Sequence, residues 1–281
     1  MGGLSTPQSL LSPLPSPAPP SISTEINIAT RGIHARLNKL IVSRLPLSVP
    51  PHSKDPRLYA YGISAFAQIY YAFEARWRHL CSSQEQENEE EKSTNSRSAA
   101  STHDAGLRPW LVELLPSGLW RSQAISTDLD HLKSILSLDL DPARNCDTLD
   151  KEMIYHVSEV TAAKPHVLVA YAWIMYMAIF SGGRWMRQQF VRAGPSFWDA
   201  GENHGASFGS PQTPVPGFSL FYFEGEEDGQ DIKADFKARL ELAERLLSAQ
   251  ERSDIVSEAK KIFEMCVELV GRLDEKLSTP A

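Results

Sequence analysis

A run without any charged residue, from Val167 to Gly183, constrains this chain more than any other feature, because such a run must be buried. It is rich in alanine, methionine, isoleucine and aromatic residues, which predicts a helix buried on most sides. The run ends in Ser181, Gly182 and Gly183, and each glycine inside a helix costs about 1 kcal/mol relative to alanine. Either the helix stops at Ser181, or the backbone there bends or lies against something large and flat. On this segment alone the helix stop is the preferred interpretation.

The composition sets broad limits on fold and partners. The chain has 281 residues, of which 42% are hydrophobic, enough for one sizeable core or at most two small ones. The net charge of −7 argues against a nucleic-acid partner, because proteins that bind nucleic acids normally carry a strong excess of basic residues. Cys81, Cys146 and Cys266 match no zinc or disulfide spacing, so they indicate a reducing compartment.

The termini carry no recognisable targeting segment. The first basic residue is Arg31, so the start lacks the positive region of a signal peptide. The uncharged run 167–183 is at the short edge of what spans a membrane, and its two glycines favour a buried helix instead. The end of the chain, 277–281, has no apolar anchor. We therefore expect a soluble, cytoplasmic protein without a membrane anchor.

Three segments have low-complexity compositions. Residues 1–24 hold six prolines and six serines without a charge, which predicts a disordered leader. Residues 82–105 contain an acidic run, for which a solvated loop is the preferred interpretation and an acidic docking motif the alternative. Residues 194–217 contain four prolines and several glycines, which predicts a long surface loop. The expected organisation is one domain over residues 25–277, with the loops 82–105 and 194–217 inserted.

Most of the remaining sequence has apolar residues at the three- and four-residue spacing of helices. Ser253 is the expected N-cap of the last helix, and Pro165 ends the fourth. No strand pattern is evident. The predicted fold class is all-α, a single bundle of about seven helices. These helices are expected over residues 26–45, 58–80, 119–138, 148–164, 166–192, 231–249 and 254–277.

Histidine is the most informative residue type, because the chain has no nucleotide-binding loop, GxSxG elbow, HExxH or CxxC motif. Asp128 with His131, and His156 with Glu159, are each one helical step apart, so either pair could offer two metal ligands. A solvated helix face is the preferred interpretation of both pairs, since the repeated Glu-x-x-His of a di-iron site is absent. His34 differs because it lies beside the apolar stripe of an early helix, where it is either structural or a ligand. The other histidines suggest no site: His52, His79, His103, His166 and His204.

Several segments taken together resemble a heme oxygenase. That family begins with a helix of the form Ala-Thr-x-x-x-His, and residues 29–34 read Ala-Thr-Arg-Gly-Ile-His. The family's distal helix ends in Tyr-Leu-Gly-Asp-Leu-Ser-Gly-Gly, and residues 176–183 read Tyr-Met-Ala-Ile-Phe-Ser-Gly-Gly. The Val-Leu-Val-Ala sequence at 167–170 and the aromatic triplet at 221–223 follow the family's order. The resemblance covers roughly residues 25–80 and 110–277.

The resemblance implies a heme oxygenase-like fold that holds heme between two helices. It implies that His34 is the proximal ligand of the heme iron. On the opposite side, Ser181, Gly182 and Gly183 would form the catalytic surface, with the two glycines lying almost against the porphyrin.

The resemblance also assigns basic residues to the heme propionates. Lys233 and Lys237 are four residues apart on one helical face, where an ordinary solvated face is the alternative interpretation. Arg31 lies one turn before His34 and could assist.

The implied activity is oxidative cleavage of heme, which is then both cofactor and substrate, to biliverdin, CO and Fe²⁺. It consumes O₂ and takes electrons from a separate NADPH-dependent reductase, since the chain has no flavin or nicotinamide motif of its own. Arg184, Arg187 and Arg192 could present a basic edge to that partner, or belong to an ordinary solvated surface.

One departure from the family pattern concerns proton delivery. The family's distal aspartate, which anchors a water network, aligns with Ile179, and Met175 and Trp173 also replace more polar residues. Isoleucine can neither order water nor relay a proton. Tyr176 and Ser181 are the nearest polar groups in sequence. Two alternatives therefore stay open: a non-catalytic heme-binding or heme-sensing protein, and an all-α scaffold that uses another ligand, including non-heme iron.

Overall fold

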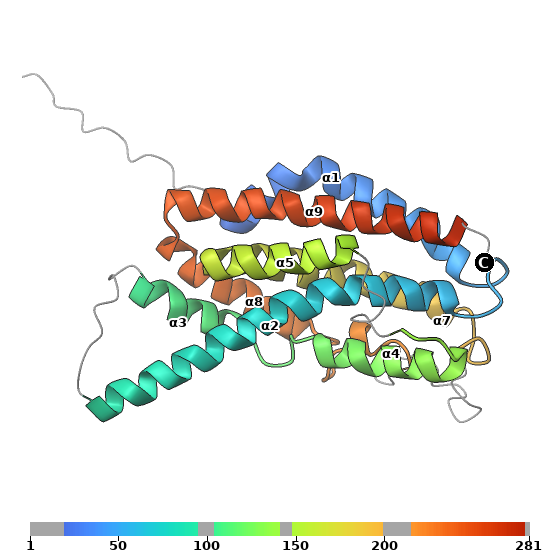
Figure 1. The fold of residues 1–281 in the computed structure, drawn as a ribbon, viewed down its shortest axis with the longest axis horizontal. Coiled ribbons are helices and arrows are strands. Elements are labelled where there is room, and N and C mark those ends of the chain that lie inside the picture. The colour runs from blue at the N-terminus through green and yellow to red at the C-terminus, as the bar shows by residue number, and fades with distance from the viewer. Residues whose placement is uncertain (1–19, 95–103, 141–147, 199–214, 279–281) are drawn as a thin grey trace, which may run out of the picture.

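The computed structural model describes residues 20–94, 104–140, 148–198 and 215–278, and every regular element in these ranges is helical (Figure 1). The all-α prediction is therefore confirmed. The longer helices are α1 (Ile22–Arg44), α2 (Arg57–Thr94), α3 (Asp104–Leu114), α4 (Ser122–Leu136), α5 (Thr148–Ala163), α8 (Gln230–Ala243) and α9 (Ala249–Ser278). Short helices at Leu45–Ser48 (η1), Ser219–Phe221 (η6) and Glu244–Leu246 (η7) join them.

A further long helix runs without a break through the middle of the bundle, and we call residues 165–191 the distal helix. From Val167 to Tyr176 every side chain is buried. It is the one helix of the described chain that is long and apolar enough to cross a membrane, but 78% of its most apolar window is buried within the protein. Its place is that of a core helix. Its parts are η2 (Pro165–Val167), α6 (Leu168–Tyr171), η3 (Ala172–Tyr176), η4 (Ile179–Gly183) and α7 (Arg184–Val191).

Helix α1 lies along α9 and runs in the same direction (Figure 1). At their starts, Arg252 of α9 pairs with Glu25 of α1 at 2.9 Å. At their ends, Arg44 of α1 pairs with Asp274 of α9. The two pairs fix the direction and register of α1 against α9.

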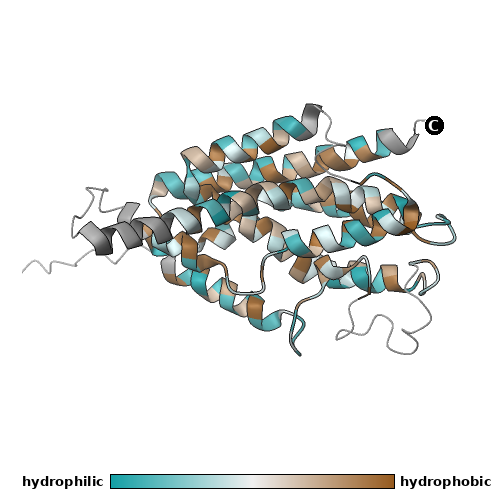
Figure 2. Ribbon diagram, turned by 60° about the horizontal axis from the view of Figure 1, so that its bottom comes forward, coloured by the Kyte–Doolittle hydropathy of each residue, from teal (hydrophilic) through white to brown (hydrophobic). Residues whose placement is uncertain are grey.

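The distal helix also follows α9 in the same direction. His166 lies 3.2 Å from a carboxylate oxygen of Asp254, and one turn later Tyr171 donates to Glu258 at 2.6 Å. Since α1 and the distal helix both run parallel to α9, they run parallel to each other. Figure 2 shows that the helices carry both hydrophilic and hydrophobic residues along their lengths, as amphipathic helices around a shared core do.

Two predicted boundaries near the acidic run were wrong. Helix α2 continues to Thr94, so residues 82–94 of the expected loop are helical, and 95–103 lie outside the described residues. Glutamate, glutamine and lysine are good helix formers, and their abundance here outweighs the polar composition that suggested a loop. Helix α3, starting at Asp104, was not predicted at all.

The ends of two other helices also differ from expectation. Helix α1 begins at Ile22 with Ser21 as its N-cap, inside the expected leader, whose residues 1–19 lie outside the described chain. Helix α9 begins at Ala249, so Ser253 is not its N-cap. Ser248 takes that role, because its backbone N–H donates to the carboxylate of Glu251 at 2.8 Å while its hydroxyl accepts from the Glu251 N–H at 3.3 Å.

The expected loop at 194–217 is described only in part. Residues 199–214 lie outside the described chain, and the ends, 194–198 and 215–217, contain no helix. The division into a leader and one domain over 25–277 stays a prediction.

Candidate functional site

The distal helix continues through Ser181, Gly182 and Gly183 to Val191, so the helix stop favoured by the segment alone was wrong. Gly183 itself has helical dihedrals, φ −58° and ψ −42°. The helix is π-helical over 172–176 and again over 179–183. Such widened turns are rare and are frequently found at functional sites.

One side of this helix is open and lined by small residues. Ala178 and Ser181 are exposed, and Gly182 is partly exposed. A Cβ atom built on Gly182 would meet only the terminal methyl of Met186, at 4.0 Å. We call Ala178, Ser181 and Gly182 the open face of the distal helix. Trp185, 42% exposed, lies one turn beyond it.

Gly183 is buried and faces another way. A Cβ built on it would lie 3.0 Å from Cδ1 of Phe221 in η6 and 3.3 Å from Cγ2 of Ile179. Close packing against η6 therefore explains the second glycine, and the open face belongs to the first.

His34 lies on α1 with an exposed imidazole. Its ring centroid is 5.3 Å from that of Phe263 in α9, and within the described chain the ring makes no hydrogen bond or ion pair. Phe263 comes five residues after Glu258, and five residues after Tyr171, the partner of Glu258, is Tyr176. Counting residues along the parallel helices places His34 near or slightly beyond the level of Tyr176, because the π-helical residues 172–176 rise less per residue than α-helical ones.

A hydrogen bond between α1 and the distal helix gives a second estimate of this level. The indole N–H of Trp173 donates to the side-chain oxygen of Asn27 at 3.1 Å. His34 comes seven residues after Asn27, and Phe180 comes seven residues after Trp173. The two estimates bracket residues 176–180, so His34 is level with the start of the open face.

Helix α8 contacts the distal helix through Phe236. Phe236 of α8 packs against Trp173 with ring centroids 6.3 Å apart. Lys233 and Lys237 flank Phe236 in sequence, and neither forms an ion pair with another described residue. Partial burial, with Lys237 and Arg184 nearby, lowers the pKa of Lys233. An anion bound here would relieve that repulsion.

Ile179, at the position of the family's distal aspartate, and the two nearest polar residues have different surroundings. Ile179 is 5% exposed and packs inward beside Gly183. Tyr176 is 1% exposed, and its hydroxyl donates to Glu74 of α2 at 2.9 Å. Ser181 has an exposed hydroxyl on the open face. Of these three residues, only Ser181 presents a polar group to the open face.

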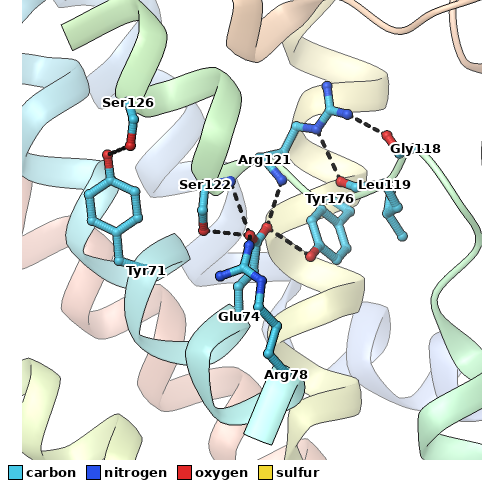
Figure 3. A network of polar contacts seen from close by, with 9 residues as sticks. All are labelled: Tyr71, Glu74, Arg78, Gly118, Leu119, Arg121, Ser122, Ser126 and Tyr176. Carbon is cyan, nitrogen blue, oxygen red and sulfur yellow. Dashed lines mark hydrogen bonds and ion pairs between the residues drawn. The ribbon is translucent and has the colours of Figure 1, made fainter. Parts of the chain in front are cut away.

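Glu74 is the centre of a buried network that sequence reasoning missed (Figure 3). Its carboxylate is fully buried and accepts from the backbone N–H groups of Arg121 at 2.8 Å and Ser122 at 3.0 Å, at the start of α4. It also accepts from the Ser122 hydroxyl and pairs with Arg78 at 3.2 Å. The available signal was a lone acidic residue inside the apolar stripe of the helix predicted at 58–80.

In each of the two acidic and histidine pairs singled out in the sequence, at least one member contacts a distant segment, while Glu159 is exposed as expected. Asp128 is fully buried, and its carboxylate accepts from the backbone N–H groups of Ser219 and Leu220, at 2.6 and 2.8 Å. His156 pairs with Glu258 of α9 at 2.9 Å, away from Glu159. Within the described ranges, no three His, Cys, Asp or Glu side chains gather closely enough to hold a metal ion.

The three arginines considered as a basic edge for a partner do not share one surface. Arg187 is 5% exposed and pairs with Asp228 at 2.7 Å, and Arg184 pairs with the same carboxylate at 3.3 Å. Of the three arginines, Arg192 alone is fully at the surface, where it bonds Gln189. A continuous basic edge is therefore absent from this described segment.

Comparison with known proteins gives one consistent result. The family model described as heme oxygenase matches residues 107–272. Heme oxygenase 2 of rabbit (Oryctolagus cuniculus) is 25% identical over 166 residues, 59% of this chain and 47% of that protein. The chain therefore spans about half the length of that relative. The heme-binding protein HMX1 of Saccharomyces cerevisiae is 24% identical over 273 residues, 93% of this chain and 78% of that protein.

Solved structures of heme oxygenases have the same fold. Heme oxygenase 2 of Chlamydomonas reinhardtii, solved without heme, superposes with a TM-score of 0.62 at 17% identity, covering 90% of this chain and 97% of that one. Heme oxygenase-1 of the cyanobacterium Synechocystis, solved with heme, gives 0.60 at 17% identity, covering 92% and 94%. The solved structures cover most of the chain, whereas the family model begins at Leu107. With the model matching more than half of its residues, this chain belongs to the heme oxygenase family.

Proposed function

We propose that this protein binds heme between α1 and the open face of the distal helix, with His34 as the iron ligand. The observation that carries the proposal is the pairing of a free, exposed imidazole with an open face at the same level. The small residues of that face fit a flat macrocycle, because a side chain on Gly182 would fill the space above it. Lys233 and Lys237, with Arg31, would hold the propionates.

We further propose that the bound heme is oxidatively cleaved to biliverdin, CO and Fe²⁺. Heme supplies the iron that activates O₂ and the porphyrin that is oxidised, and a separate NADPH-dependent reductase would supply electrons. The chain's own residues would hold the iron at His34, leave room for the macrocycle at Gly182 and offer the Ser181 hydroxyl as a hydrogen-bond donor at the open face. Gly183 supports this surface indirectly by allowing the distal helix to pack against η6.

Binding of heme without cleavage is the second candidate, and Ile179 favours it. A buried isoleucine leaves the position of the family's aspartate without a group that orders water. Tyr176 does not compensate, since its hydroxyl is already donated to Glu74. Ser181 would then be the one polar residue that the open face offers to the bound heme.

Hemin titration of the whole chain tests both candidates. The wild-type protein should give a Soret shift that saturates at one hemin per chain. His34→Ala should lose that shift and regain it with added imidazole, whereas His52→Ala, with its exposed side chain on a loop, should match the wild type. Absence of a shift, or an unchanged one in His34→Ala, would overturn the proposed site.

Addition of a reductant and O₂ to the hemin complex then separates cleavage from binding. Loss of the Soret band together with biliverdin and CO supports the oxygenase. A complex that keeps its Soret band through repeated reduction supports the heme-binding alternative and rules out the cleavage reaction under those conditions.

A further inference from the structure

Two hydrogen bonds join one side of α2 to the π-helical part of the distal helix. Tyr70 donates its hydroxyl to the backbone carbonyl of Met175 at 2.9 Å. Glu74, four residues later on the same side of α2, accepts the hydroxyl of Tyr176 at 2.9 Å. The bonds therefore reach adjacent residues of η3, immediately before the open face begins at Ala178.

Both hydroxyls are committed donors. Tyr70 is 3% exposed and Tyr176 is 1% exposed. Burial, reinforced by the nearby charge of Glu74, raises the pKa of each phenol, so each keeps its proton. A side-chain donor on a helix carbonyl competes with the helix's own N–H groups, which is a recognised cause of local irregularity in helices. The contact from Tyr70 lies within the π-helical residues 172–176.

The acceptor of the second bond is itself held rigidly. Besides Tyr176, the carboxylate of Glu74 receives both N–H groups and the hydroxyl at the start of α4, together with the guanidinium of Arg78 (Figure 3). A carboxylate at a helix N-terminus is also stabilised by the helix dipole. Movement of Tyr176 would therefore require movement of α2 and α4 as well.

We propose that Tyr70 and Glu74 are positioning residues for the heme site: they clamp η3 and so set where the open face lies relative to heme. The inference rests on the proposed function, since it concerns the same face. Neither residue touches that face, so each acts through Met175 or Tyr176. The clamp does not substitute for the distal aspartate as a proton donor. Its loss should therefore alter the surroundings of the heme on the side of the open face.

Tyr70→Phe and Tyr176→Phe test the clamp with little change in volume. Tyr71→Phe is the matched control, because Tyr71 is the neighbour of Tyr70 on α2 but bonds Ser126 of α4 at 3.0 Å. In the protein without heme, hydrogen–deuterium exchange of amides 174–184 should accelerate at least fivefold in the two clamp variants and stay unchanged in the control. Unchanged exchange in both clamp variants would overturn the clamp, whatever the protein does with heme.

The hemin complexes supply the second readout. The CO stretching frequency of the reduced complex reports the side opposite His34, and we expect it to shift in both clamp variants and not in Tyr71→Phe. Hemin affinity should fall about fivefold in the clamp variants. Faster exchange with an unchanged CO frequency and affinity would overturn the assigned role toward heme. Failure of the wild-type chain to bind hemin overturns the proposed function and that role with it, while the exchange result stands by itself.

Discussion

Gly183 is held against Phe221 so closely that a Cβ atom on the glycine would lie 3.0 Å from the ring carbon Cδ1. Phe221 is 2% exposed and Ile179, the other neighbour, is 5% exposed, so neither has room to retreat. Gly182 has no such neighbour, because the nearest atom would be Cε of Met186 at 4.0 Å. The adjacent glycines therefore serve different purposes, one for packing and one for the open face.

The first prediction separates these two purposes by alanine substitution. Gly183→Ala should lower the free energy of unfolding by about 1 kcal/mol, since overpacking of roughly 2 kcal/mol exceeds the gain of about 1 kcal/mol in helix propensity. Gly182→Ala should leave stability unchanged or raise it by up to about 1 kcal/mol, while weakening hemin binding about tenfold by placing a methyl group on the open face. Urea unfolding and hemin titration of both variants measure the two effects. Equal loss of stability in both would contradict the assignment.

The sequence predicted the distal helix well and its two glycines only in part. The uncharged run and its composition identify a buried helix, and the motif order identifies the family. Which glycine faces η6 depends on Phe221, about forty residues away in sequence, and on π-helical turns that shift the faces of the helix. No local pattern reports either of these. The helix stop was wrong for the same reason, because tertiary packing supplies the stabilisation that two glycines forfeit.

The second prediction concerns the lysines of α8. Replacing Lys233 and Lys237 together by alanine should weaken hemin binding about tenfold at low salt, with the larger share from Lys233 because it is less exposed. The deficit should shrink as salt rises, since screening already weakens these contacts in the wild type. Lys133→Ala, an exposed lysine on α4, is the control. Wild-type affinity in the double variant would leave the lysines as an ordinary solvated face.

The third prediction is a pH dependence of stability that comes from Asp128. Burial, opposed by hydrogen bonds from the backbone of Leu220 and Ser219, raises the pKa of Asp128 from 3.8 to about 6. A carboxyl whose pKa is raised in the folded state stabilises the fold when protonated, so its contribution is present below pH 3.8 and is lost as pH rises through 6. Between pH 7 and pH 5 it should add about 1 kcal/mol to the free energy of unfolding.

Asp128→Asn isolates that contribution, because the amide keeps an acceptor for η6 and does not titrate. Urea unfolding at pH 5 and pH 7 should show that the variant lacks the gain on acidification that the wild type has. If both proteins change by the same amount, groups other than Asp128 account for the pH dependence.

The buried acids show where sequence reasoning ended. Asp128 was interpreted as part of a solvated helix face and Glu74 was not singled out, but both carboxylates bind backbone N–H groups of distant segments. Helical periodicity reports which residues share a side of a helix, and here both acids lie near apolar positions. Nothing in the periodicity tells which N–H groups will meet a carboxylate, because that depends on where α4 and η6 begin in space. His34, in contrast, could be singled out because its motif is local.

The fourth prediction tests whether water reaches Ile179, the position of the family's distal aspartate. Ile179 is 5% exposed and packs beside Gly183, so Ile179→Asp should lower the free energy of unfolding by roughly 3 kcal/mol at pH 7. The loss should be smaller at pH 5, because a carboxyl raised in pKa by burial can become neutral there. Ile179→Val, expected to cost about 1 kcal/mol at either pH, is the control for lost volume. Urea unfolding of the three proteins at both pH values measures these differences. A variant as stable as Ile179→Val at pH 7 would mean that the position is hydrated, and would remove the burial of Ile179 as an argument for binding without cleavage.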